Sequence, residues 1–257
     1  MISLGYHFGM DKIVDKGWKR VGANDVYSIR AHEKNEPIPL AELRSWLLAD
    51  DNLQRIQDHL SWYFSQEYSG KYFEWFVGHS DPRVFTPWDI LAVEALSVSV
   101  PTETASWLLN PKGDCHHLLA ASNQRMASGQ DSLWTCDEAF LGDGQPLSDL
   151  YTFLRKKDGL GPVTTSKLLA TKFPNLVPIR DSKVETLLGL EKSREWWAPI
   201  RSLFTEQGQS LSEYLDKLDV PEEFGTITTL RRLDVILWME AKARRIETGK
   251  VPPRRFS

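Results

Sequence analysis

The stretch DGLGPVTTSKLLATKFPNLVPIRDSKV, residues 158–184, joins two predicted helices through a glycine turn and ends beside a single carboxylate. Gly159 and Gly161 permit positive φ angles and close approach of another backbone or a ligand. Pro162 is suited to the first position of the helix that follows. Unpaired N–H groups at such a helix start point outward and can bind an anion. The stretch therefore predicts either a phosphate-binding turn or, since two glycines alone are common, an ordinary connection between helices.

The residues on both sides of this stretch also predict helices. Leu53, Ile56, Leu60 and Phe64 form one apolar stripe in residues 51–68. Residues 86–100 begin with Thr-Pro and an Asp that is typical of a capping box. A third long helix is expected in residues 227–245, with its apolar stripe at Leu230, Leu233, Leu237 and Ala241.

The predicted fold is mainly α. We expect a mixed N-terminal segment, residues 1–38, packed on the core and carrying a weak strand signal at 25–30. Residues 39–257 should form a helical domain of two lobes, with the hairpin at 158–173.

The composition indicates an ordinary globular protein. The 257 residues are 41% hydrophobic and 26% charged, which suffices for one large core or two modest lobes. Two cysteines are too few for a disulfide scaffold. The most apolar run, residues 89–100, contains Glu94 and is too short to span a membrane. We therefore expect a cytoplasmic protein without a signal peptide or membrane anchor.

The charge is acidic overall but unevenly distributed. The net charge is −4 and the pI is near 5.9, whereas nucleic-acid-binding domains are usually basic. Residues 155–183 nevertheless contain seven Lys or Arg against two Asp, and residues 227–257 contain eight against three acids. Such polarisation can hold a polyanion on one face. Solvated helix surfaces and a basic tail are the alternative explanation.

Asp181 has two possible roles. Ser182 to Glu185 fits a capping box, which puts Asp181 at or just before a helix start, where the helix dipole favours an ionised carboxylate. The residue could simply cap that helix. The second role is implied by the resemblance of this stretch to DNA glycosylases, in which such a carboxylate stabilises the positive charge that develops on a sugar when an N-glycosidic bond breaks. The two roles are compatible.

The same stretch resembles the helix–hairpin–helix segment of the HhH-GPD DNA glycosylases, the endonuclease III-like superfamily. The hairpin matches at Gly159, Leu160 and Gly161, and the aspartate element matches at Asp181 and Val184. The resemblance covers about thirty residues and implies double-stranded DNA as the partner and Asp181 as the catalytic residue. The DNA-binding residues that it suggests, together with nearby cations, are Gly159, Leu160, Gly161, Thr164, Lys167, Arg180 and Lys183.

Residues 85–98, 165–184 and 230–239 resemble an uncharacterised bacterial family more widely. That broader resemblance implies no particular activity.

Two departures from the glycosylase pattern narrow the expected chemistry. Bifunctional members carry a nucleophilic Lys two residues after the second hairpin glycine, and this chain has Val163 there. Schiff-base chemistry needs an amine, so a β-lyase is not expected. Some members hold an iron–sulfur cluster with four cysteines, but this chain has two. The resemblance thus implies a monofunctional glycosylase without a cofactor.

Other polar and aromatic residues are weaker candidates. A flipped base is usually held by stacking on aromatic rings, and Trp75, Phe76, Trp88 and Trp238 are candidates, although core packing explains most aromatic residues. Asp234 could reach the active site or form a plain ion pair. Zinc at Cys115, His116, His117 and Cys136 is not expected, because adjacent helical histidines point about 100° apart.

The sequence leaves three functional hypotheses. The first is a monofunctional DNA glycosylase, monomeric and associated with the bacterial nucleoid, that removes a damaged or modified base and could act on foreign DNA. The alternative is a non-catalytic helix–hairpin–helix DNA-binding protein. The third is a helical protein-interaction module that does not touch nucleic acid.

Overall fold

The computed structural model describes residues 36–65, 68–110, 112–126, 131–191, 193, 196–244 and 246. The secondary structure of these residues is helical and contains no strand, which confirms the prediction of a mainly α fold. Most of the predicted N-terminal segment, including the strand signal at 25–30, lies outside the described residues. At its end, the Ile38 backbone N–H donates to the Leu187 carbonyl at 2.8 Å, and the Ile38 side chain is buried.

The described residues form twelve α-helices. They are α1 (Leu40–Leu48), α2 (Asp50–Ser65), α3 (Phe73–Val77), α4 (Pro87–Ala95), α5 (Thr102–Leu108), α6 (Asp114–Met126), α7 (Pro146–Leu154), α8 (Pro162–Ala170), α9 (Ser182–Leu188), α10 (Trp197–Thr205), α11 (Leu211–Asp216) and α12 (Thr229–Ala243). Three 3₁₀ helices supplement them: η3 (Ser69–Tyr72), η4 (Glu138–Leu141) and η5 (Glu222–Phe224).

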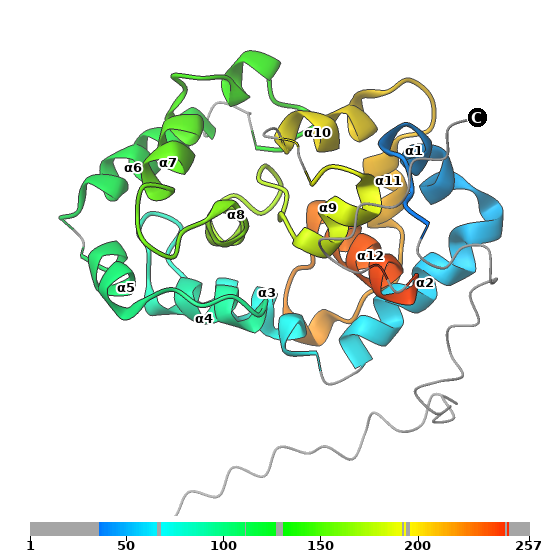
Figure 1. The fold of residues 1–257 in the computed structure, drawn as a ribbon, viewed down its shortest axis with the longest axis horizontal. Coiled ribbons are helices and arrows are strands. Elements are labelled where there is room, and N and C mark those ends of the chain that lie inside the picture. The colour runs from blue at the N-terminus through cyan, green and yellow to red at the C-terminus, as the bar shows by residue number, and fades with distance from the viewer. Residues whose placement is uncertain are drawn as a thin grey trace, which may run out of the picture.

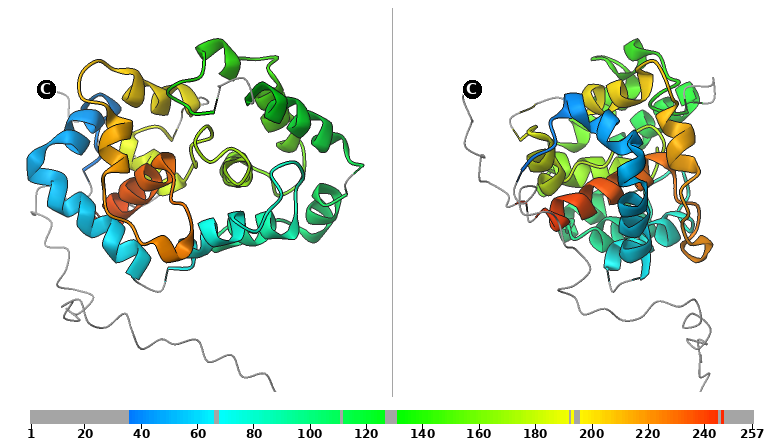
Figure 2. Two further views of the ribbon diagram at one scale, coloured as in Figure 1. Left: turned by 180° about the vertical axis from the view of Figure 1, so that it is seen from behind. Right: turned by 90° about the vertical axis from the view of Figure 1, so that its right-hand side faces the viewer.

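Two hydrophobic cores give the molecule two lobes (Figures 1 and 2). The first lobe combines both ends of the described chain, because α1 and α2 pack with α9 to α12. Its buried side chains include Leu43, Ile56, Leu187, Ile200, Leu211 and Leu233. The second lobe is formed by the middle of the chain, α4 to α8, around Leu108, Leu119, Leu150 and Leu168.

Helix α8 of the second lobe is seen nearly end-on near the centre of Figure 1. Its Ala170 packs with Phe73 of α3, Ala92 of α4 and Ile179 in a small separate cluster. The chain leaves α8, passes Ile179 and enters the first lobe at α9. The hairpin and Asp181 therefore sit at the two ends of a segment that links the lobes.

The apolar stripes predict the buried faces of the long helices with one exception. All four residues predicted for α12, from Leu230 to Ala241, are at most 4% exposed. In α2, Ile56 and Leu60 are fully buried, but Leu53 is 47% exposed. Leu53 lies in the first turn of α2, one turn before the part of the helix that meets the core. The prediction for Leu53 was therefore wrong.

A buried carboxylate ties α2 to α12. Glu240 of α12 contacts Arg55 and His59 of α2 at 2.6 and 2.7 Å, and Arg244 at 2.6 Å. Burial acts to raise the pKa of Glu240, but the hydrogen bond and charge of His59, the charge of Arg55 and the hydrogen bond from Arg244 lower it to about 2. The pairing therefore stabilises the ionised carboxylate inside the first lobe.

A second buried carboxylate confirms a predicted cap. The Asp89 side chain accepts from the Thr86 N–H at 2.7 Å and completes the capping box of α4. It also pairs with the Lys172 ammonium at 2.7 Å, and both side chains are fully buried. Lys172 belongs to the cation-rich stretch at 155–183, so part of the positive charge of that stretch neutralises a buried carboxylate.

None of the described helices is both long enough and apolar enough to cross a membrane.

Candidate functional site

The hairpin between α7 and α8 needs glycine at its first position. Gly159 has φ +75°, in the left-handed region that favours glycine. A Cβ atom there would lie 2.3 Å from Cδ of Pro101, which is closer than packed atoms come. Thr104 fixes the same turn by donating its hydroxyl to the Asp158 carbonyl at 2.8 Å. The turn is thus packed against the start of α5.

The second hairpin glycine faces open space. Gly161 is exposed, and a Cβ added to it would meet no atom within 4 Å. It is the N-cap residue of α8, Pro162 follows as predicted, and no side chain caps the first turn. Leu160 is buried, and Thr164 is 9% exposed. An uncapped helix start beside an open glycine is suited to binding a phosphate oxygen through backbone N–H groups.

Lys167 does not face solvent. Its side chain is 5% exposed, and its ammonium donates to Oδ2 of Asp181 at 3.2 Å and to the Leu96 carbonyl at 3.0 Å. Lys167 lies on the second turn of α8, and its ammonium bridges the end of α4 and the start of α9. A phosphate at the hairpin could not reach this ammonium without a rearrangement.

Arg180 also points inward. Its guanidinium contacts Oε1 of Glu185 through Nε at 2.7 Å and the Ser193 carbonyl at 2.9 Å. It lies over the Trp196 ring, 5.9 Å from the ring centroid. The phosphate role predicted for Arg180 and Lys167 therefore corresponds to no exposed group, because both cations are buried and already pair with carboxylates.

Two further cations of the cation-rich stretch lie beside the hairpin. Arg155 and Lys156 directly follow α7 and are exposed. The neighbouring Lys157 is half-buried, with its ammonium 4.3 Å from the Trp107 ring centroid. A run of three cations just before a glycine turn was the available signal for these positions.

Asp181 is both a helix cap and a member of an ion pair. It is the N-cap of α9, and its Oδ1 accepts from the Lys183 N–H at 3.0 Å. Its Oδ2 accepts from Lys167. The side chain remains 18% exposed, so solvent reaches the carboxylate. The cap is Asp181 itself, whereas the predicted box began one residue later at Ser182.

A second carboxylate lies close to Asp181. Asp234 of α12 pairs with Arg231 one turn earlier on the same helix, and its side chain is 9% exposed. Burial raises the pKa of Asp234, Arg231 opposes this, and the nearby charge of Asp181 raises the pKa further. The ion pair with Arg231 was the predicted role. The charges of Asp181 and Lys167 act on Asp234, which makes Asp234 part of the site as well, and the packing of α9 against α12 brings these groups together.

Aromatic rings and lysines adjoin the start of α9. Trp238 lies one turn beyond Asp234 on α12, and the Lys183 ammonium is 5.9 Å from its ring centroid. Tyr68 meets the Trp238 ring edge-on at 5.5 Å, and Lys242 donates to the Tyr68 hydroxyl at 2.8 Å. These residues combine flat apolar surface with positive charge, the combination that stacks bases and neutralises phosphates.

The other three predicted base-pocket residues gather elsewhere. Trp75 and Phe76 of α3 meet Trp88 of α4, with ring centroids 6.0 and 6.2 Å apart, and His79 joins them. Trp75 is 42% exposed. The structure therefore brings Trp238 to the Asp181 site and places Trp75, Phe76 and Trp88 in a separate surface cluster.

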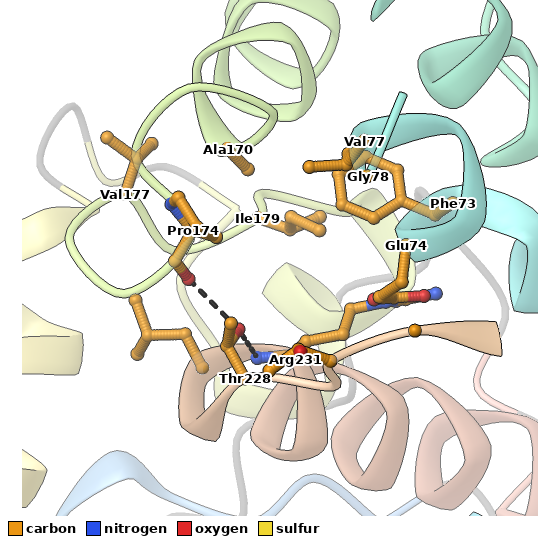
Figure 3. Close-up of a pocket in the computed structure, with 13 residues that line it drawn as sticks. Phe73, Glu74, Val77, Gly78, Ala170, Pro174, Val177, Ile179, Thr228 and Arg231 are labelled. Atoms are coloured by element: carbon orange, nitrogen blue, oxygen red, sulfur yellow. Dashed lines mark hydrogen bonds and ion pairs between the residues drawn. The ribbon is translucent and has the colours of Figure 1, made fainter. Parts of the chain in front are cut away.

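A cavity of about 390 Å³ opens between α3, α8 and the start of α12 (Figure 3). Its lining includes Phe73, Glu74, Ala170, Ile179, Thr228 and Arg231. Asp181 is not among its lining residues. Arg231 connects this cavity to the Asp181 site, because it contacts Glu74 in the cavity and Asp234 beyond it.

Cys115, His116, His117 and Cys136 show no arrangement suited to zinc. Cys115 and Cys136 are buried, and burial raises the pKa of Cys115 to about 11. Nε2 of His116 lies 3.0 Å from the Leu108 carbonyl. Within the described part of the chain, no group of three or more His, Cys, Asp or Glu side chains is placed to hold a metal ion.

Residues 56–241 match a family described as "Family of unknown function (DUF6308)", and since the match covers more than half of the sequence, the chain belongs to that family. Searches of curated proteins and of solved structures found no match. The family agrees with the broader resemblance to uncharacterised proteins. These comparisons give no support to the resemblance to HhH-GPD glycosylases, which stays a prediction.

Proposed function

We propose that this family member is a monofunctional DNA glycosylase, which hydrolyses the N-glycosidic bond of a damaged or modified base. The observation that carries the proposal is the position of Asp181. Its partly exposed carboxylate lies at the start of α9 and contacts Lys167 of α8. Asp234 lies nearby, and Lys183 of α9 adjoins the Trp238 ring. A phosphate-gripping turn, a carboxylate and a stacking ring are the parts that base excision needs.

In the proposed reaction the backbone of the hairpin holds a DNA phosphate at Gly161, and Arg155 and Lys156 add positive charge beside it. The target base leaves the stack and rests against Trp238. As the glycosidic bond breaks, positive charge develops on the sugar, and Asp181 stabilises it with Asp234 adding negative potential. The base leaves with the electron pair of the broken bond, and water then bonds to the sugar carbon and gives up a proton, so that the base departs protonated. Val163 supplies no amine, so the strand is not cleaved.

The pairing of Lys167 with Asp181 supports a second candidate function. The Lys167 ammonium already neutralises the Asp181 carboxylate. A carboxylate in such a pair stabilises a developing cation less than an unpaired carboxylate does. On this alternative the protein binds DNA through the hairpin without catalysis. The Asp181–Lys167 pair would then serve to stabilise the folded site.

We further propose that the protein acts as a monomer on double-stranded DNA in the bacterial cytoplasm, on the nucleoid or on modified foreign DNA. The experiment that separates the candidates combines two readouts on the same wild-type protein. Base release is measured on a panel of duplexes that carry damaged or modified bases, and DNA binding is titrated at several salt concentrations. Release from one duplex supports the glycosylase. Salt-dependent binding without any release favours the non-catalytic protein, and no salt-dependent binding rejects both.

A further inference from the structure

The cavity between α3, α8 and α12 has the size of a ligand site and lies outside the Asp181 site (Figure 3). Its volume of about 390 Å³ falls within the range of known small-molecule pockets, about 300–1,000 Å³. Most of its wall is apolar, with Phe73, Val77, Ala170, Val177, Ile179 and Leu230. An apolar body fits such a wall, because burial of apolar surface is favourable.

Most of the polar groups in the wall already have partners. The Thr228 hydroxyl accepts from the Arg231 N–H and donates to the Pro174 carbonyl at 3.1 Å. The Arg231 guanidinium donates to Glu74, Asp234, the Tyr63 hydroxyl and the Gly70 carbonyl. With these donors engaged, Arg231 has little capacity left for an anionic ligand.

Glu74 is different, because one of its carboxylate oxygens has no partner. Its Oε1 accepts from Nε of Arg231 at 2.8 Å. Its Oε2 is buried and has no hydrogen-bond partner among the residues that the structure describes. The side chain is only 6% exposed. Glu74 lines the cavity, and leaving its buried acceptor unsatisfied is costly, so a donor bound beside Glu74 would satisfy this oxygen.

The charges around the cavity do not balance. Glu74 and Asp234 share the one guanidinium of Arg231, while Lys167 is paired with Asp181. Around Arg231, two carboxylates thus face one cation. Burial raises the pKa of Glu74, Arg231 opposes this, and the charge of Asp234 raises it further. A bound cation would compensate the remaining negative charge.

We propose that this cavity, the Glu74 pocket, binds a small organic cation, namely a primary amine on an apolar aromatic or hydrocarbon body. The ammonium donates to Oε2 of Glu74, and the body packs against Phe73, Ala170 and Ile179. This site is separate from the proposed DNA chemistry and does not depend on it.

The test compares two ligands of the same shape on the full chain by isothermal titration calorimetry. 1-Naphthylmethylamine carries the ammonium, and 1-naphthalenemethanol is its neutral counterpart. We expect the amine to bind at least roughly tenfold more tightly, because a hydrogen bond to a charged group is worth more than a neutral one. Equal affinities, or no binding of the amine, would overturn the proposal.

Two variants locate the binding. Glu74→Gln should reduce the affinity for the amine to that for the alcohol. Val77→Trp should fill the half-buried edge of the pocket and abolish binding of both the amine and the alcohol. If Glu74→Gln does not fold, Val77→Trp alone shows whether the ligand binds in the pocket. Leu91→Trp, at a 39% exposed position on α4, is the matched control and should change neither affinity. Unchanged amine binding by folded Val77→Trp would place the ligand elsewhere and reject the pocket.

Discussion

Removal of the Lys167 ammonium should destabilise the protein through the charge that it leaves behind. In Lys167→Met, Oδ2 of Asp181 loses its 3.2 Å partner. Breaking a fully buried pair from one side costs about 3–5 kcal/mol. Asp181 is 18% exposed and keeps the Lys183 N–H, so we expect a smaller loss in the free energy of unfolding, about 2 kcal/mol.

Substitution of the other partner, Asp181, should lower the free energy of unfolding by a similar amount, because it leaves a cation instead of an anion unpaired. Asp181→Asn retains a good N-cap side chain, but it leaves the Lys167 ammonium, 5% exposed, without a counter-charge. The double variant has neither charge. Its loss should therefore be smaller than the sum of the two single losses by about 1–3 kcal/mol, as for residues in direct contact.

Urea unfolding of the four proteins, followed by circular dichroism, measures this coupling. Losses that add within about 0.5 kcal/mol would refute the pair. The Lys167 ammonium would then be free of Asp181 and available to a phosphate, as the sequence alone suggested.

Three further predictions concern pH, the hairpin and its cations. Above about pH 4.5 the low pKa of Glu240 should contribute roughly 3 kcal/mol to the free energy of unfolding, and this contribution should be lost as the pH falls toward 2. Glu240→Gln should weaken this pH dependence in urea titrations. Gly159→Ala should lower the melting temperature, because Gly159 has a positive φ and an added Cβ would clash with Pro101. Gly161→Val should keep the fold and weaken binding to all duplexes alike in fluorescence anisotropy. Arg155→Ala and Lys156→Ala should each reduce the slope of log K against log salt by about one; unchanged slopes would place the DNA elsewhere.

The sequence predicts those parts of the fold that depend on local rules. The stripe of α12 follows from helical periodicity, and the Asp89 cap follows from the Thr-Pro-x-Asp pattern. The left-handed Gly159 follows from a glycine turn between two helices. Leu53 fits the same periodicity but lies beyond the core, because periodicity does not reveal where a helix meets its neighbours.

The site was only partly predictable, because charge counts do not reveal which way a side chain points. Lys167 and Arg180 belong to a cation-rich stretch, yet their partners Asp181 and Glu185 turn both inward. The approach of Asp234 to Asp181 joins residues of two helices that are far apart in the chain. Such contacts follow from tertiary packing, so no local pattern predicts them.

The most direct test of the proposed function is the response of base release and DNA binding to Asp181→Asn. The substitution removes a negative charge next to DNA and keeps the helix cap. Binding of a releasable duplex should therefore hold or strengthen, while single-turnover release should fall by at least about 100-fold. Circular dichroism at the assay temperature confirms that the variant is folded. Equal release by wild type and variant would remove Asp181 from the mechanism, and loss of binding together with loss of the fold would leave it a structural cap.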